Sequence, residues 1–372
     1  MDSGAGGLTK YKMFIGGEWV DSASGDVFES FNPYTAKPWA LMPKGNAADV
    51  DRAVEAADKA LKSGDWPALT ATARGHMIRK FADLIVDKAD ELAEIEVRDN
   101  GKLIAEMSAQ CKYLAQWYYY YAGLCDKIEG SVIPIDKPGH FNYTVWEPLG
   151  VVACIVPWNS PLLLLAWKLA PLLAAGNTAV IKPSEYTSAS TLEFMKIAEQ
   201  VFPPGVVNVV TGFGGEAGSP LVDHPKVAKV AFTGSDATGS AIYAQAAKHM
   251  KKVTMELGGK SPNIVFSDAH IDNAVKGVIS GIFAATGQTC IAGSRLLVQE
   301  SIHDEFVEKL VALGATAKIG DPTSFETQVG PVTNIPQYEK VLDYIEDLDP
   351  ELSNLIKTQF WNNQILNERP IV

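Results

Sequence analysis

The chain has 372 residues and a formal net charge of −12, and hydrophobic residues make up 47% of it. This length fits two or three packed units, and the composition allows a sizeable core. The acidic charge is spread out without a basic face, so nucleic acid is not an expected partner. No apolar run reaches the length of a membrane-spanning helix, so we expect no membrane insertion.

The four cysteines lie far apart at positions 111, 125, 154 and 290, and neither they nor the six histidines have the spacing of metal ligands. Scattered cysteines in a chain of this length favour a reducing compartment over a disulfide framework. The first nine residues lack a basic region followed by an apolar run, so no secretory signal is expected. These features predict a cytoplasmic protein without a metal site.

The first 150 residues combine short strands with helices. Lys12–Val20 has two strand-like pieces around Gly16-Gly17, which predicts a hairpin. A helical pattern starts at Ala47, and another helix is expected over Ala109–Leu124. Phe141, Tyr143 and Val145 then alternate with polar residues, as in a half-exposed strand.

After Gly150, short apolar runs alternate with helical stretches. Runs this apolar indicate strands buried on both faces, and strands separated by helices indicate a parallel α/β sheet. The expected strands are Val151–Val156, Thr178–Ile181, Val206–Val210, Val230–Thr233, Asn263–Phe266 and Arg295–Gln299.

Two polar motifs follow expected strands, where parallel sheets bind ligands. Pro157-Trp158-Asn159 offers an amide that could donate to an oxyanion, or simply close a turn. Lys182-Pro183-Ser184-Glu185 offers an ammonium and a carboxylate that could bind ribose hydroxyls, or form a solvated loop. A carboxylate there would favour NAD over NADP.

Two glycine-containing turns also follow strands. The turn Thr211–Gly218 contains Gly-x-Gly without the full dinucleotide-binding spacing, which is a weak signal alone. Phe232-Thr233-Gly234-Ser235 leads to Gly239 at the start of a helix. Ser235 and the free N–H groups of that helix could hold a phosphate, and an ordinary N-cap serine is equally consistent.

The last two motifs are Glu256-Leu257-Gly258-Gly259-Lys260 and Gly287-Gln288-Thr289-Cys290. A lone glutamate is usually a surface residue and a free cysteine usually a small core residue. Glycines after Glu256 allow a close approach of the backbone, and the neighbours of Cys290 are untypical of a core.

In this order the motifs PWN, KPSE, FTGS, ELGGK and GQTC resemble the aldehyde dehydrogenase superfamily, as does the 34-residue spacing from Glu256 to Cys290. The resemblance covers about residues 12–345. It implies an α/β fold with a variant dinucleotide-binding parallel sheet and a partial α/β catalytic domain. The implied division is residues 1–129 and 149–258 for NAD binding, 130–148 for an oligomerisation hairpin, 259–345 for catalysis and 346–372 for an atypical tail.

The resemblance implies NAD-dependent oxidation of an aldehyde to a carboxylic acid. Cys290 would be the nucleophile that forms a thiohemiacetal and then a thioester, and Glu256 the base that activates water. Asn159 and the Cys290 backbone N–H would hold the oxyanion, and Lys168 would assist proton transfer.

For the cofactor, the resemblance assigns Lys182 and Glu185 to the adenine ribose and Ser235 to the pyrophosphate. The whole cofactor-binding set is Ile155, Pro157, Trp158, Lys182, Ser184, Glu185, Gly212, Gly234, Ser235, Gly239, Leu257 and Gly258. The substrate-lining set is Ser160, Leu164, Trp167, Thr289 and Ile291. Ser160 stands where many relatives have an aromatic residue, which indicates a wider or more polar pocket.

The chain departs from the family after about residue 345, where relatives continue with a Glu-x-Phe motif and an oligomerising strand. We expect an incomplete catalytic domain that exposes apolar surface, with weak folding or low activity. A homodimer or homotetramer is expected if the family architecture is completed. Two alternatives remain: a CoA-acylating relative, which would not need Glu256, and a catalytically silent protein that still binds nucleotide.

Overall fold

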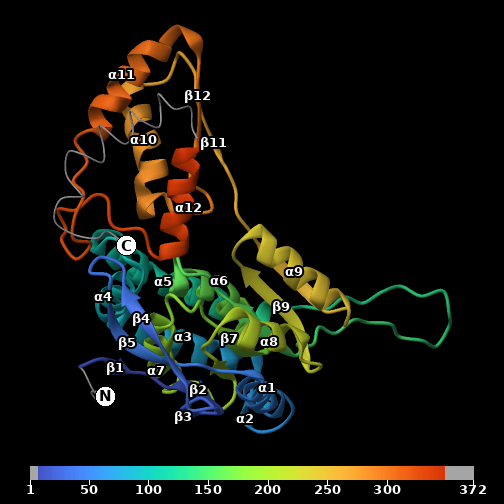
Figure 1. Cartoon of the computed structure of the whole chain (residues 1–372). Helices are drawn as coiled ribbons and strands as arrows, with labels where there is room; N and C mark the ends of the chain where they lie inside the picture. The colour runs from blue at the N-terminus through green and yellow to red at the C-terminus, as the bar shows by residue number, and fades with distance from the viewer. Residues whose placement is uncertain (1–6, 348–372) are drawn as a thin grey trace.

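The computed structural model describes residues 7–347 and divides them into two parts (Figure 1). The large lobe, residues 7–258, is built on a seven-stranded sheet in the order β10-β9-β6-β7-β8-β2-β3. Its first five strands are parallel, as predicted, and β2 joins β8 in the antiparallel direction. The small lobe, residues 259–347, contains the parallel pair β11–β12.

The strands of the large lobe are β1 (Thr9–Lys10), β2 (Met13–Ile15), β3 (Glu18–Val20), β4 (Val27–Asn32), β5 (Lys37–Pro43), β6 (Val151–Ile155), β7 (Thr178–Lys182), β8 (Val207–Val209), β9 (Val227–Thr233) and β10 (Lys252–Glu256). Its α-helices are α1 (Ala47–Lys62), α2 (Asp65–Ala68), α3 (Ala71–Asp87), α4 (Ala89–Asn100), α5 (Ile104–Leu124), α6 (Pro161–Ala174), α7 (Ala189–Ala198), α8 (Ser219–Asp223) and α9 (Asp236–Ala247). The short helices η1 (Cys125–Lys127) and η2 (Gly214–Gly218) complete it.

The small lobe contains β11 (Pro262–Val265), β12 (Arg295–Val298), α10 (Ile271–Phe283), α11 (His303–Gly314) and α12 (Ile335–Glu346). Its short helices are η3 (Ala284–Gly287) and η4 (Glu300–Ile302).

The central strands are buried on both faces, which explains their uninterrupted apolar sequence. All five residues of β6 and of β7 are buried. Along β6, Val152 and Cys154 belong to one core cluster, and Val151, Ala153 and Ile155 to another. This alternation follows from the two-residue period of a strand and gives the sheet a separate core on each face.

Helices cover both faces of this sheet, so the connections between its parallel strands are the α/β crossovers expected from the sequence. Helix α1 packs against β7 and β8, and α6 packs against β6 and β7. At the edge, β2 and β3 form the predicted hairpin, and Gly16 and Gly17 both have left-handed φ values, which a tight two-residue turn requires.

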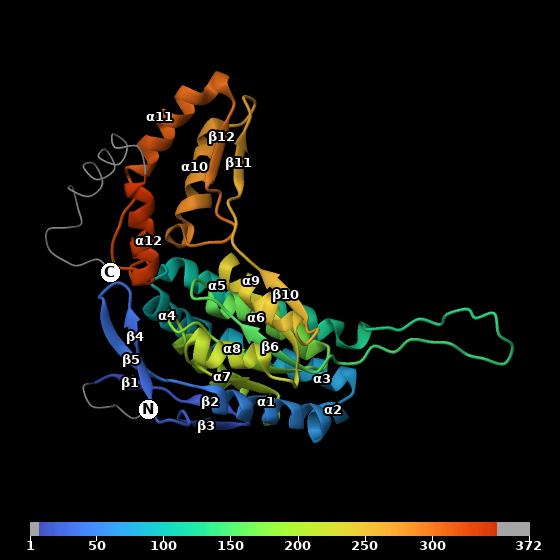
Figure 2. The ribbon, with the colours of Figure 1, turned by 45° about the vertical axis from the view of Figure 1, so that its right-hand side comes forward.

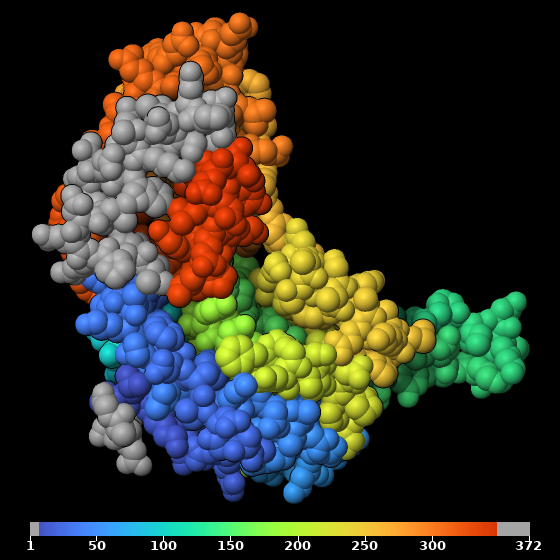
Figure 3. Space-filling model, in the orientation of Figure 1, coloured from blue at the N-terminus to red at the C-terminus, as the bar shows by residue number. Residues whose placement is uncertain are grey.

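A long arm, residues 130–148, projects from the large lobe as a separate finger (Figure 3). The half-exposed strand predicted over Phe141–Val145 is not formed, because the arm contains only an isolated antiparallel bridge between Val132 and Tyr143. Phe141 and Trp146 are more than 70% exposed. The alternating sequence is present, but no third strand among the described residues pairs with it, and an isolated hairpin is marginal in water.

The small lobe stands on the large lobe beside α9 (Figure 2) and buries much less apolar surface. Its core cluster has only four buried members, Val265, Val275, Val278 and Phe306. Among the described residues its sheet is a single pair of strands, and Ile264 and Phe266 are exposed. The described part of the small lobe thus has open strand edges and exposed apolar side chains.

Helix α5 and strand β10 differ from the sequence predictions. Helix α5 begins at Ile104 rather than Ala109. Strand β10 was not predicted, because it lies at the sheet edge and its alternating Lys252–Glu256 sequence lacks the apolar run of a central strand. The sequence also allows a helix over residues 351–360, which lie outside the described residues. In the described part of the chain, no helix is long and apolar enough to cross a bilayer.

Candidate active site

The loops that carry the polar motifs leave one edge of the large sheet. Ile155 at the end of β6 pairs with Lys182 of β7 and Phe232 of β9. Glu256 at the end of β10 pairs with Thr233 of β9. Because these strands are parallel, their carboxyl ends lie side by side, where open α/β sheets bind ligands.

Asn159 and the cysteine loop meet across the boundary between the lobes. The Asn159 Nδ2 donates a hydrogen bond of 2.8 Å to the backbone oxygen of Gln288, 129 residues further along the chain. Asn159 follows the half-buried Pro157 and Trp158 beyond β6. The fold thus brings the predicted oxyanion donor within two residues of Cys290.

The ELGGK motif also reaches the cysteine loop. A Cβ placed on Gly259 would lie only 3.2 Å from the backbone oxygen of Cys290, so glycine allows the two backbones to approach. Cys290 has a free, half-buried thiol. Of its neighbours, Thr289 is half-buried and Ile291 is 76% exposed. The motifs after β6 and β10 therefore converge on the same cysteine.

Glu256 and Lys168 lie at the neighbouring strand ends. Glu256 is exposed, whereas Lys168 on α6 is buried and donates a hydrogen bond to the Thr233 Oγ1. Burial lowers the pKa of Lys168, and the electrostatic interaction with Glu256 opposes this shift. A lysine with a lowered pKa near a carboxylate is suited to proton transfer.

The KPSE motif forms a half-buried ion pair. The Lys182 Nζ lies 3.1 Å from the Glu185 Oε2, and the lysine is almost fully buried. Burial lowers the pKa of Lys182, and Glu185 opposes the shift. Ser184 stabilises the turn itself, because its Oγ accepts from the backbone N–H of Tyr186 and its carbonyl accepts from Ser188 Oγ.

Ser235 is the N-cap of α9, where its Oγ accepts a hydrogen bond from the backbone N–H of Thr238. The ELGGK loop packs beside this terminus, since the Gly258 N–H donates to the Asp236 side chain. A Cβ on Gly239 would collide with the Leu257 side chain at 2.5 Å. Ser235, Gly239, Leu257 and Gly258 thus lie together at the start of α9.

Gly234 and Gly212 have packing reasons for being glycine. A Cβ on Gly234 would lie 2.4 Å from the Phe232 ring. Gly212 has a φ of +128°, and a Cβ there would lie 2.7 Å from the backbone oxygen of Gly45. Close packing against the chain itself is therefore enough to explain both glycines.

The predicted substrate-lining residues of α6 and its N-cap face α5. Leu164 and Ser160 are buried, and Trp167 is 40% exposed with its ring edge-on to Trp117 of α5, at 5.7 Å between centroids. The Ser160 Oγ accepts a hydrogen bond from the Lys102 Nζ. Sequence reasoning missed Lys102, because the only local signal was a charged residue in the short Asn100-Gly101 turn between two helices.

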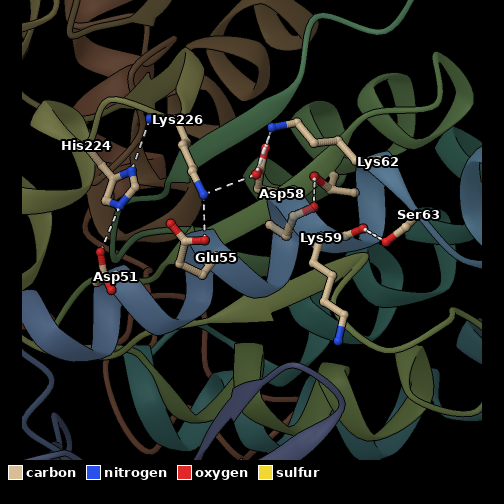
Figure 4. Close-up of polar contacts among 10 residues, drawn as sticks. Asp51, Glu55, Asp58, Lys59, Lys62, Ser63, His224 and Lys226 are labelled. Carbon is tan, nitrogen blue, oxygen red and sulfur yellow. Dashed lines mark hydrogen bonds and ion pairs between the residues drawn. The ribbon is translucent and has the colours of Figure 1, made fainter.

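A second polar cluster lies on the far part of the large lobe, between α1 and the turn that follows α8 (Figure 4). Asp51, Glu55 and His224 could each supply a metal ligand by distance. However, the Glu55 Oε2 binds the Lys226 Nζ at 2.6 Å, and the His224 Nδ1 accepts from the Lys226 backbone N–H while its Nε2 faces Asp51. The cluster is an ion-pair network rather than a metal site.

A sequence model of the aldehyde dehydrogenase family matches residues 19–357. The chain belongs to this family. It is 48% identical to an Acinetobacter baylyi (Z)-2-((N-methylformamido)methylene)-5-hydroxybutyrolactone dehydrogenase, over 91% of this chain and 69% of the relative. It is 43% identical to a hydroxyisobutyraldehyde dehydrogenase of Mycolicibacterium austroafricanum, over 90% of this chain and 66% of that protein.

Solved aldehyde dehydrogenases share the fold. An NAD⁺ complex of the Bacillus cereus enzyme superposes with a TM-score of 0.88 at 44% identity, covering 91% of this chain and 69% of the other. A Staphylococcus aureus betaine aldehyde dehydrogenase with bound NAD⁺ gives the same TM-score at 39% identity, over 90% of this chain and 68% of the other. The chain therefore spans about two thirds of the length of these relatives.

Proposed function

We propose that this aldehyde dehydrogenase chain carries the site for NAD-dependent oxidation of an aldehyde to a carboxylic acid, with Cys290 as nucleophile. The single observation that carries the proposal is the hydrogen bond from Asn159 to Gln288, two residues before the cysteine. The Gly259–Cys290 approach supports it, because it brings the loop after Glu256 to the backbone of the same cysteine.

The residues would act in two stages. The Cys290 thiolate attacks the aldehyde carbon, and the Asn159 amide donates to the oxygen as it gains negative charge. NAD, when bound, would supply the hydride acceptor, and loss of a hydride from the thiohemiacetal carbon would leave Cys290 as a thioester. Glu256 then takes a proton from water, the hydroxide oxygen attacks the thioester carbon, and the C–S bond breaks to release the acid and the thiolate.

The residues present fit NAD. Lys182 and Glu185 offer a donor and an acceptor for ribose hydroxyls, and the carboxylate disfavours the 2′-phosphate of NADP. Ser235 and the α9 N-terminus offer a hydroxyl and backbone N–H groups to the pyrophosphate. Ile155, Pro157 and Trp158 end the neighbouring strand β6. We accordingly assign nucleotide binding to residues 1–129 and 149–258, and catalysis to 259–345.

For assembly, we propose that the arm 130–148 joins copies of the chain in a homodimer or homotetramer. Its support is the row of exposed apolar residues Val132, Ile135, Phe141, Tyr143, Val145 and Trp146, which is unusual for a monomer surface. A cytoplasmic location stays a prediction from the four free cysteines.

A catalytically silent nucleotide-binding protein is the second candidate. The observation that favours it is the small core of the lobe that carries Cys290, against the two large core clusters of the lobe that would bind NAD. A CoA-acylating enzyme is less consistent with the presence of Glu256 at the end of β10, because such an enzyme would not need this base.

The decisive experiment measures NADH formation with a panel of aldehydes, with and without CoA, together with intact-mass labelling of Cys290 by an aldehyde-mimicking electrophile. Acid formation without CoA supports the proposal. NAD binding without turnover or NAD-sensitive labelling would favour the silent protein, and a strict requirement for CoA would favour the acylating enzyme.

A further inference from the structure

The segment from Glu96 to Glu106, which joins α4 to α5, contacts both loops of the candidate site. No motif marked this segment, and it lies more than 50 residues from Asn159 and more than 175 from the cysteine loop. Its contacts reach the Asn159 loop and the cysteine loop through different side chains.

On the Asn159 side, two buried charged residues hold the start of α6. The Lys102 Nζ donates to the Ser160 Oγ at 2.5 Å. The Glu96 Oε1 accepts from the Leu162 backbone N–H at 3.0 Å. Because Ser160 follows Asn159 directly, these bonds fix the backbone that carries the predicted oxyanion donor.

On the cysteine side, Glu106 holds a strained turn. Its Oε1 accepts from the Ala285 backbone N–H at 2.9 Å. Ala285 and Thr286 have φ values of +53° and +55°, a left-handed conformation that costs a residue with a Cβ roughly 1 kcal/mol. Strain of this kind persists only where the surroundings hold it, and it is common at functional sites.

This turn leads directly to the contact between the loops. Gln288, which ends the turn, is the residue whose carbonyl accepts from Asn159. A second bond reaches Gln288 from the same segment through Thr333: the Asn100 carbonyl accepts from the Thr333 Oγ1 at 2.7 Å, and the Thr333 N–H donates to the Gln288 Oε1 at 3.0 Å.

The two sides are also linked by charge. Burial lowers the pKa of Lys102, and electrostatic interactions with Glu96 and Glu106 oppose that shift. Glu106 thus interacts with Lys102 while its Oε1 holds Ala285. Its Oε2 is buried and has no hydrogen-bond partner among the described residues.

We propose that Glu106 and Lys102 are positioning residues that hold the cysteine loop and the Asn159 loop in register. The role rests on the proposed function, since it is through Asn159 and Cys290 that the two residues act. Glu106 sets the turn before the nucleophile, and Lys102 sets the backbone of the oxyanion donor.

The kinetic test compares E106A with E106Q, and K102M with K102R. A misplaced nucleophile should lower kcat by roughly 10- to 100-fold in E106A while the KM for NAD stays unchanged. E106Q keeps an oxygen for the Ala285 N–H and should retain most of the activity, and K102R should exceed K102M. The matched control is K112M, which removes an exposed lysine on the same helix that pairs with Asp90.

A readout independent of turnover is amide hydrogen exchange over residues 284–290. E106A should speed exchange in this turn, E106Q and K112M should not, and the thermal midpoint should move little. T286V removes the hydroxyl that bonds Gly330. It should also speed amide exchange in this turn, and unlike E106A it removes no charged group. Unchanged kcat and exchange in E106A and T286V would overturn the role. If the wild-type chain shows no turnover, the proposed function fails, and the exchange result alone decides whether Glu106 positions the cysteine loop. The two proposals can therefore fail separately.

Discussion

The two lobes differ in how much of their own stability they supply. The large lobe has a seven-stranded sheet with a core on each face, whereas the described part of the small lobe has one strand pair and a four-residue core. The predicted nucleotide-binding residues lie on the large lobe and the cysteine on the small one. The loop that carries the proposed nucleophile is hydrogen-bonded to the large lobe through Asn159 and Glu106.

The largest expected effect separates chemistry from nucleotide binding. Cys290→Ser should lower aldehyde oxidation by at least about 1000-fold, because the hydroxyl is a far weaker nucleophile than the thiolate. The Kd for NAD should stay unchanged, since its predicted contacts lie on the large lobe. Steady-state kinetics and calorimetric NAD titration measure the two quantities. Equal loss of NAD affinity would contradict the division of labour between the lobes.

The next prediction concerns the cores. Phe81 packs edge-on against Tyr118, Phe194 and Phe202. Phe81→Ala should cost about 3–5 kcal/mol of the free energy of unfolding of the large lobe. Phe306→Ala removes an equally buried ring from the small lobe. If the small lobe unfolds at a lower urea concentration than the large lobe, this change should lower the midpoint of that first transition only. Urea unfolding monitored by circular dichroism tests this prediction. A single transition whose midpoint is lowered equally by both substitutions would show that the two lobes unfold as one cooperative unit.

The free energy of unfolding of the large lobe should depend on pH through its buried carboxyl groups. Burial raises the pKa of Glu96 to about 7, well above its value in the unfolded chain, and the backbone N–H of Leu162 and Lys102 oppose the shift. Between about pH 4.5 and 7 the unfolded state loses this proton first, so stability falls as pH rises and levels off above about 7.

Glu96→Gln should flatten that fall, because the amide does not ionise and its oxygen can still accept from Leu162. The measurement is the free energy of unfolding at pH 5 and pH 8. Burial raises the pKa of Asp99 to about 7 as well, so part of the slope should remain in the variant. An identical slope in both proteins would exclude Glu96 as a source.

A smaller effect is expected on cofactor choice. Glu185→Gln should shift the ratio of NADP to NAD affinity toward NADP by roughly 10-fold, or about 1.4 kcal/mol, since the carboxylate that repels a 2′-phosphate is gone. The control is Glu193→Gln, which breaks a similar i,i+3 ion pair with Lys196 elsewhere on the large lobe. If both variants give the same ratio, Glu185 does not select the cofactor.

The smallest effect belongs to the ion-pair network of Figure 4. Lys226→Met breaks contacts with Glu55 and Asp58 but should change the free energy of unfolding less than any substitution above, because solvent screens the charge of the exposed lysine. Chemical denaturation measures it. A larger loss would show that this network, and not only the two core clusters, stabilises the large lobe.

The sequence by itself determined the central strands and the order of the motifs. Apolar runs such as Val151–Val156 leave no polar face, so burial in a parallel sheet follows from composition alone. Strand β10 shows the limit of this reasoning, since an edge strand is defined by the neighbour with which it pairs. The predicted strand in the arm fails for the same reason, because alternation describes a surface but does not provide a partner.

The tertiary structure alone decided how the site is assembled. Glu106, Lys102 and Thr333 carry no motif, and their importance lies in contacts with residues 45 to 179 positions away in sequence. Hydrogen bonds act over about 3 Å, so a role of this kind is invisible until the chain has folded. The sequence determined which groups are candidates for chemistry at Cys290, and the contacts of the segment between α4 and α5 with both loops decided how those loops are held.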